Sequence, residues 1–482
     1  MAITRRNFLA AVSLGPSALS TALLPQRTRR KNVVFVVSDD LNRALGTYGH
    51  PIVRSPHLDR VAQRGVVFER AYCQFPMCQP SRTSFLSGMR PDSTGVLGLR
   101  IPTRVKLKDH LFLPEYFRKH GYYTAMSGKV YHTGEYAEDP RSWDEEYREF
   151  GKSPEREDVI EDDKGKGPQG HNSRWAKLRL DDAEMPDGNV ARRAVQLMEK
   201  AQRNNTPFFL GVGFRRPHAP YAAPKKYFDM YPPDRLPLPK TPRNHFDRLL
   251  YSAVNHEPPA EPMSEAVVRQ YLSAYYASVT FMDAQLGVLL DGLDRLKLWD
   301  STVVLFVSDH GYHIGDHGGL WHKTTLFDQA LCVPLVVASP GQRAVGKRSE
   351  RIVELVDMYA TLTELCGLPS NDVLEGSSFA PLLDQPHRKW KRAAFAVQTR
   401  GKQRKSATMA MDDIEYLGRS VCTERWRYTE WDGGKRGVEL YDHASDPDEL
   451  NNLAALSSFS AVEAEMRQIL RAGWKASRPP RA

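Results

Sequence analysis

The chain has 482 residues and a net charge of +9, with 41% hydrophobic and 26% charged residues. A chain of this length is too long for one hydrophobic core, so we predict a large domain and a smaller one. The two fractions are typical of a soluble globular protein. No helix-turn-helix, zinc-finger or RNA-binding signature accompanies the positive charge, so nucleic acid is excluded as an expected partner.

The N-terminus carries a predicted export signal. Residues 4–9 read TRRNFL and open an apolar run that extends to Leu24, which is typical of a twin-arginine signal peptide over residues 1–24. Gly15-Pro16 interrupts the run, and no later segment is long and apolar enough to span a bilayer. We expect a periplasmic or secreted protein that uses the Tat translocon and has no membrane span in its mature form. An ordinary N-terminal helix is the alternative.

Four short apolar segments alternate with helical patterns and predict strands of a mostly parallel sheet, covered by helices on both faces. They are residues 32–38, 122–127, 207–214 and 302–308. Residues 267–296 repeat apolar side chains at helical spacing and predict a long helix. Ionisable residues follow each strand: Asp39 and Asp40, Lys129 and His132, His218, and Asp309 and His310. Because ligands bind beyond the carboxyl ends of such strands, we predict a single site there.

The remaining segments predict a second, smaller unit and two surface regions. Residues 136–186 are highly charged and predict a long surface excursion, and the Pro-rich residues 216–263 predict loops at the rim of the pocket. After Pro381, residues 392–398, 416–422 and 426–431 predict antiparallel strands, and residues 461–472 predict a helix. We therefore expect an α/β catalytic domain over residues 30–385 and an α+β subdomain over residues 386–482.

The segment CQPSRTSFLSG at residues 78–88 is the most informative motif. Pro80 suits the first turn of a helix and Gly88 its end, which places Cys78 at a helix N-terminus, where an anion is favoured. The alternatives are a buried thiol or a disulfide with Cys73. The cysteines are five in number, and their pairing cannot be assigned from the sequence: Cys73, Cys78, Cys332, Cys366 and Cys422.

This segment resembles the sulfatase signature C-x-P-S-R-x-x-x-L-[ST]-G. Further matching motifs stand in sulfatase order at residues 37–40, 128–132, 216–220, 308–311 and 321–323. The spacing of Lys129 and His132, the Asp309-His310 pair and the endings at residues 439–442 and 446–454 are similar to the iduronate-2-sulfatase branch. The resemblance implies an alkaline-phosphatase-like fold and hydrolysis of sulfate esters. It also implies that a formylglycine-generating enzyme converts Cys78 to formylglycine before export.

The resemblance also implies the site. Asp39, Asp40, Asp309 and His310 would hold a divalent cation with the modified Cys78, and carboxylates favour Ca²⁺, then Mg²⁺. For Asp39 and Asp40 alone, a strand-end turn or helix cap is the alternative. A hydroxyl of the formylglycine hydrate would attack sulfur while Arg82 holds the hydrate. The remaining roles fall to four residues: His218 is the general acid candidate beside Lys323, His132 takes the second proton to expel sulfate, and Lys129 pairs with nearby charge.

Substrate recognition is predicted from the residues around this site. Tyr312 stands where the iduronate branch has a Trp, and we expect it to stack on a sugar ring. Lys323, His218, Arg215 and Arg216 would favour a sulfated sugar or polysaccharide fragment with a second negative charge, with 2-O-sulfated uronic acid as the leading candidate. A phosphate or phosphonate monoester hydrolase and an inactive glycan-binding relative are the alternatives. His313, His317 and His322 are interpreted as solvated loop residues.

Overall fold

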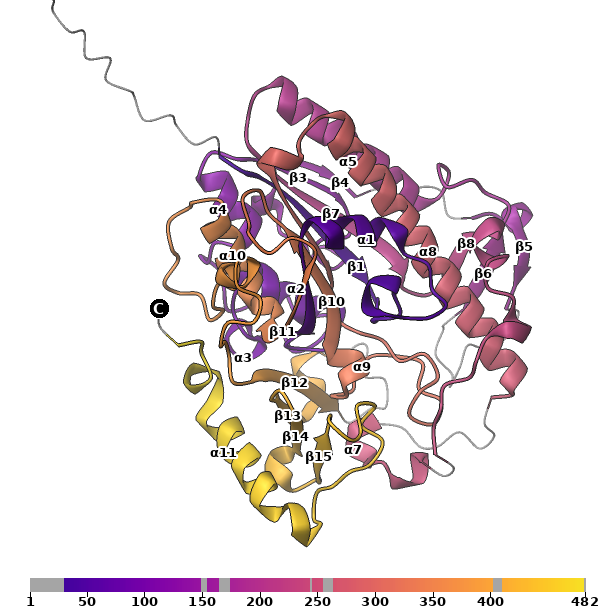
Figure 1. Cartoon of the computed structure of the whole chain (residues 1–482), viewed down its shortest axis with the longest axis vertical. Coiled ribbons are helices and arrows are strands. Elements are labelled where there is room, and N and C mark those ends of the chain that lie inside the picture. Colours follow the sequence, from indigo (N-terminus) through magenta and orange to yellow (C-terminus); the bar gives the residue numbers. More distant parts are fainter. Residues whose placement is uncertain are drawn as a thin grey trace, which may run out of the picture.

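A computed structural model describes residues 30–148, 154–163, 174–242, 245–254, 263–401 and 410–480. The predicted signal peptide at residues 1–24 lies outside these ranges. Figure 1 shows a large unit built around one sheet, with a smaller unit at the C-terminal end of the chain. No helix in the described part of the chain has the length and apolar character needed to cross a bilayer.

The large unit contains an eight-stranded sheet with the order β11-β2-β10-β9-β1-β7-β3-β4. Its strands are β1 (Asn32–Asp39), β2 (Val66–Tyr72), β3 (Tyr123–Gly128), β4 (Glu145–Tyr147), β7 (Phe208–Pro217), β9 (Thr302–Ser308), β10 (Cys332–Ala338) and β11 (Lys347–Glu354). β10 runs antiparallel to both of its neighbours, and the other pairs are parallel. The predicted mostly parallel sheet is therefore confirmed, and the four predicted strands correspond to β1, β3, β7 and β9.

Helices cover both faces of this sheet (Figure 1). One face packs against α2 (Cys78–Ser87), α4 (Leu113–Lys119) and α10 (Met358–Leu365), and the other against α1 (Pro56–Arg64), α5 (Pro186–Arg203) and α8 (Glu265–Arg295). Along β1, Phe35 belongs to the first core, whereas Val34 and Val36 belong to the second. A strand buried on both sides reads as an uninterrupted apolar run, which explains the sequence of β1. The predicted long helix is α8.

The described parts of the charged segment 136–186 contain three short strands. It contributes β4 to the edge of the main sheet, and β5 (Val159–Asp162) and β6 (Trp175–Leu178) to a small sheet that is completed by β8 (Tyr221–Pro224). Trp143 and Trp175 are buried in the two cores. The sequence did not predict these short strands, because charged residues predominate in the segment and its few apolar residues form no periodic pattern. Short helices complete this unit: α3 (Pro91–Thr94), α6 (Lys225–Phe228), α7 (Tyr251–Val254) and α9 (Asp328–Leu331).

The smaller unit is an antiparallel sheet covered by a helix. The sheet contains β12 (Ala394–Gly401), β13 (Ile414–Cys422), β14 (Trp426–Trp431) and β15 (Val438–Asp442), and α11 (Ser460–Ala476) packs against it. Met466 and Ile469 of α11 contact Val421, Tyr428 and Leu440 of the sheet in one apolar cluster. The predicted strands and terminal helix are present, together with β15.

Candidate active site

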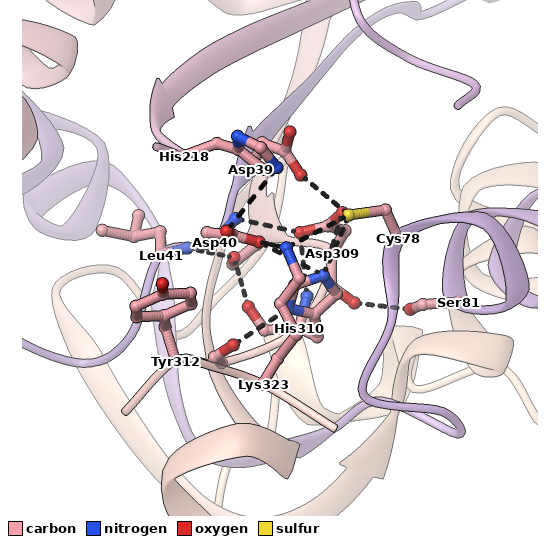
Figure 2. A network of polar contacts seen from close by, with 12 residues as sticks. Asp39, Asp40, Leu41, Cys78, Ser81, His218, Asp309, His310, Tyr312 and Lys323 are labelled. Atoms are coloured by element: carbon pink, nitrogen blue, oxygen red, sulfur yellow. Dashed lines mark hydrogen bonds and ion pairs between the residues drawn. The ribbon is translucent and has the colours of Figure 1, made fainter. Parts of the chain in front are cut away.

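The ionisable residues that follow β1, β7 and β9 lie close together: Figure 2 shows Asp39, Asp40, His218, Asp309 and His310 around one point. β1 lies between β7 and β9, and Ser38 is in register with Ser308. The next residues along each strand, Asp39 and Asp309, are therefore neighbours. His218 directly follows β7. The polar residues that the sequence placed beyond the strand ends are thus brought together by the topology of the sheet.

The turn after β1 directs two successive carboxylates into the site. Asp40 has a φ of 61°, a left-handed conformation that is uncommon outside glycine. Its N–H donates to Asp309 Oδ1 at 3.3 Å, and its carbonyl accepts from the Tyr275 hydroxyl at 2.9 Å. In a continuing strand, Asp40 would point to the face opposite Asp39. The turn prevents this, and Tyr275, which the sequence placed only in a helical core stripe, holds the turn in place.

Cys78 begins α2, and Gly88 ends it with a φ of 67°, as the sequence predicted. Cys78 Sγ lies 3.4 Å from Asp39 Oδ1, 3.3 Å from His310 Nε2 and 3.7 Å from Lys323 Nζ. The five cysteines are free and buried, so the alternative of a Cys73–Cys78 disulfide is wrong. Burial, followed by the Asp39 carboxylate, raises the pKa of the Cys78 thiol. This thiol is therefore not a ready thiolate nucleophile.

Four side chains offer ligand atoms that all lie within 4.8 Å of one another: Asp39, Asp40, Cys78 and His310. The His310 ring donates from Nδ1 to the Gly311 carbonyl at 2.9 Å, which turns Nε2 toward Asp40 Oδ1 at 3.4 Å. An outer hydrogen bond of this kind orients histidines that bind metals. The carboxylate oxygens fit a hard cation such as Ca²⁺ or Mg²⁺.

Asp309 lies beside this group of four. Its Oδ1 accepts the N–H groups of Asp40 and His310, at 3.3 and 3.0 Å, and its Oδ2 accepts from Arg82 Nε at 2.9 Å. Oδ2 also lies 3.6 Å from His310 Nε2. Asp309 thus orders the turn and the arginine in addition to bordering the predicted metal position.

Three cations surround the carboxylates. Lys129 Nζ lies 2.5 Å from Asp39 Oδ2, and Lys323 Nζ lies 2.5 Å from Asp40 Oδ1. The fully buried Arg82 pairs with Asp39 at 3.3 Å and donates to the backbone carbonyls of Lys129 and Val130. Burial opposes ionisation of Asp39, but Lys129, His218 and Arg82 hold its pKa well below the usual range. Lys129 and Arg82 therefore offset the negative charge of Asp39, and Lys323 offsets that of Asp40.

The two predicted catalytic histidines are neutral at neutral pH. Burial lowers the pKa of His218 to about 4, and burial together with Lys129 lowers the pKa of His132 to about 3. His218 donates from Nδ1 to the Ala219 carbonyl at 2.6 Å, and its Nε2 lies 3.8 Å from Asp40 Oδ2. His132 lines a small cavity with Lys129. A bound cation would lower both pKa values further, since it adds positive charge.

Two residues predicted to contact substrate are engaged elsewhere. Tyr312 is 3% exposed, its ring stacks on Tyr275, and its hydroxyl bonds with the Tyr221 hydroxyl at 2.9 Å and the Trp321 carbonyl at 3.2 Å. The Tyr312 side chain is therefore enclosed by protein, and no face of its ring is available for stacking on a sugar. Arg216 is buried and donates to the carbonyls of Ala222 and His218, so it shapes the loop that carries His218. The predicted substrate contacts of Tyr312 and Arg216 are therefore wrong, because both side chains are buried.

The structure also adds a residue that the sequence analysis missed. Asp187, in the first turn of α5, accepts the N–H groups of Arg215 and Arg216 at 2.9 and 2.8 Å and so fixes the end of β7.

The histidines His313, His317 and His322 are buried, so their interpretation as solvated loop residues is wrong. Nothing in the local sequence pattern distinguishes such histidines from exposed ones.

The large sheet, its two helical layers and the site at its strand ends have the α/β architecture of the alkaline-phosphatase-like enzymes. Residues 31–368 match the family model described as "Sulfatase", and residues 315–475 match the model "N-sulphoglucosamine sulphohydrolase, C-terminal". The chain therefore belongs to the sulfatase family and is a sulfuric ester hydrolase.

Known relatives agree with this assignment. The chain is 31% identical to iduronate 2-sulfatase of Homo sapiens, with 83% of this chain and 85% of the relative aligned. A solved structure in complex with its substrate D-glucosamine-2-N,6-O-disulfate has a TM-score of 0.73 at 19% identity, covering 92% of this chain and 97% of that one. The phosphonate monoester hydrolase of Silicibacter pomeroyi has a TM-score of 0.76 at 21% identity, covering 92% and 95%. The two solved structures show that this chain shares their fold.

Proposed function

We propose that the protein is an exported, formylglycine-dependent sulfatase that removes sulfate from acidic sugars or polysaccharide fragments. The observation that supports it most strongly is the position of Cys78. This residue begins α2 within 4.8 Å of the ligand atoms of Asp39, Asp40 and His310. In this position Sγ stands in for the oxygens of a formylglycine hydrate, which would accept charge-assisted bonds from Lys323 and meet the helix N-terminus.

The donor set fits a divalent cation. Asp39, Asp40 and His310 would hold it, with Asp309 at the border, and two carboxylates with an imidazole suit Ca²⁺ or Mg²⁺. Such a cation supplies Lewis-acid polarisation of a sulfate oxygen when it is bound.

The protein side chains have separate tasks in the proposed reaction. Arg82 and Lys129 fix the Asp39 carboxylate and hold positive charge beside residue 78. Burial opposes protonation of Lys323, but Asp40 and Cys78 hold its pKa well above the usual range, so Lys323 stays protonated and would donate a hydrogen bond to the leaving oxygen. His132, whose pKa is lowered to about 3, has a free lone pair at neutral pH to accept the second hydroxyl proton and so release sulfate.

His218 is not protonated in the free site, so it is not ready to act as a general acid. Its ring is neutral in the free site because burial lowers its pKa to about 4. It would donate a proton to the leaving group only after taking one from the medium or the substrate, and otherwise it orients that group through Nε2. Lys323 would stabilise the charge that develops on the leaving oxygen, because it stays protonated beside Asp40.

The substrate proposal rests on the relatives and on the two accessible basic side chains. Lys323 and His218 have side chains that are 17% and 28% exposed, respectively. The protonated Lys323 suits an anionic sugar, and 2-O-sulfated uronic acid is the first compound to test because a relative is an iduronate 2-sulfatase. With Tyr312 and Arg216 buried, selectivity for the carboxylate has less support than the sulfatase chemistry.

Mass analysis of the Cys78 peptide, combined with turnover of a substrate panel, tests the proposal. We expect formylglycine at residue 78, hydrolysis of sulfated sugars, and loss of activity in Cys78→Ala with the fold retained. Cys366→Ala is the matched control, since Cys366 is a buried thiol outside the site. An unmodified Cys78 in active enzyme would contradict the mechanism. Faster turnover of a phosphonate monoester than of every sulfate would instead support the phosphonate hydrolase alternative.

A further inference from the structure

A second group of metal-ligating side chains lies outside the catalytic residues. It contains His313, Asp316 and His317, from the loop between β9 and α9, and His245, which precedes α7. The three histidines are at most 2% exposed. His313, Asp316 and His317 offer ligand atoms that lie within 4.8 Å of one another, and His313 Nδ1 contacts Asp316 Oδ1 directly. His245 Nε2 lies 3.2 Å from His317 Nδ1.

The outer nitrogens of two of these rings contact oxygen atoms. His317 Nε2 lies 3.2 Å from Gln329 Oε1, and His313 Nε2 lies 2.7 Å from Thr325 Oγ1. Histidines that bind metals usually donate their second N–H to such an oxygen, which fixes the ring and its tautomer. This leaves Nδ1 of His313 and of His317 as the candidate ligand atoms, in a group whose ligand atoms lie within 4.8 Å of one another. The 3.2 Å separation of His245 Nε2 and His317 Nδ1 matches the ligand spacing of about 3.3 Å in a tetrahedral site with Zn–N bonds of about 2.0–2.1 Å.

The electrostatic surroundings favour a cation. Within the described ranges, no lysine or arginine forms a hydrogen bond or ion pair with any of the four side chains. Asp316 is the acidic side chain of the group, whereas the nearby Glu449 carboxylate is already paired with Arg427 and His443. A buried group of imidazoles with one carboxylate suits a borderline metal ion more than Ca²⁺.

We propose that His245, His313, Asp316 and His317 form a binding site for a transition-metal ion of the Zn²⁺ type, separate from the catalytic cation site. The bound ion would tie the segment before α7 to the loop that carries His310 at one end and Lys323 near the other. The competing explanation is a metal-free network in which His245 Nε2–H donates to His317 Nδ1.

Cobalt titration of the full-length enzyme separates these explanations. The enzyme is stripped with chelator and saturated with Ca²⁺ to fill the catalytic site, and Co²⁺ is then added. We expect one equivalent of Co²⁺ to bind with the intense visible d–d absorption of tetrahedral coordination, and Zn²⁺ to abolish that absorption by displacement. The absence of this absorption in the wild-type protein would overturn the proposal without any variant.

Four variants locate the site. His317→Gln and Asp316→Asn should lose the absorption, whereas His387→Gln, which changes an exposed histidine outside the cluster, should keep it. Asp39→Asn should also keep it, because that change affects only the catalytic cation site. Retention of the signal in His317→Gln, or its loss in Asp39→Asn, would overturn the assignment. If His317→Gln does not fold, His245→Gln replaces it, since His245 lies in a loop outside the sheet.

Discussion

Arg82 is expected to be one of the most sensitive positions for stability, and Arg82→Lys tests this. The guanidinium is fully buried and makes three hydrogen bonds, to Asp309 Oδ2 at 2.9 Å and to the carbonyls of Lys129 and Val130 at 2.5 and 2.9 Å. It also pairs with Asp39 at 3.3 Å. A lysine keeps the charge but lacks the planar fork that reaches carboxylate and carbonyls together.

The expected loss follows from these contacts. We expect lysine to keep one hydrogen bond and lose two, and hydrogen bonds to charged groups contribute about 1.5–3 kcal/mol each. The free energy of unfolding should therefore fall by about 3 kcal/mol or more. Arg419→Lys is the control, because Arg419 makes a similar two-bond pair with Asp92 while both side chains are nearly half exposed. Exposed pairs contribute about 1 kcal/mol or less.

Urea unfolding followed by circular dichroism, with Ca²⁺ present at constant concentration, measures both variants. We expect a clear decrease in the unfolding midpoint for Arg82→Lys and almost none for Arg419→Lys. Equal midpoints for the two variants would refute the reasoning, since they would show that burial of the guanidinium does not determine its contribution. The measurement does not depend on turnover, so it is independent of the proposed reaction.

Three further predictions concern the site and the smaller unit. Asp39→Asn should weaken divalent-cation binding and turnover at least about tenfold, because one carboxylate charge is lost; full metal content by elemental analysis with full activity would contradict this. His132→Ala should leave sulfate on residue 78 during turnover, detectable by peptide mass, and its absence would remove His132 as the base. Burial opposes protonation of His443, but Cys422 and Glu449 raise its pKa to about 11, so its stabilising effect is complete below about pH 6.5 and is lost as pH rises to about 11. The stability difference between wild type and His443→Gln should therefore shrink from pH 7 to pH 10, and a constant difference would show that the charge is not involved.

Local patterns in the sequence predicted the elements that position the site. The apolar run of β1, the helical spacing of α8 and the Pro80–Gly88 boundaries of α2 were correct because they depend on neighbouring residues and on backbone geometry. The alternation of strands and helices also predicted that polar residues beyond the strand ends would meet, since parallel strands end at the same edge of a sheet.

Only the tertiary structure decided which polar residues face the site and which support it. Tyr312 is buried by Tyr221 and Tyr275, which lie 91 and 37 positions away, and His317 is enclosed by His245 and Gln329. The sequence by itself determined the four strands that carry the site, the long helix α8, the strand-end carboxylates and the position of Cys78 on its helix. The burial of individual side chains such as Tyr312 and His317 could not be predicted from the sequence. It arises from packing between segments that are distant in the chain, and such packing leaves no periodic pattern in the sequence of either segment.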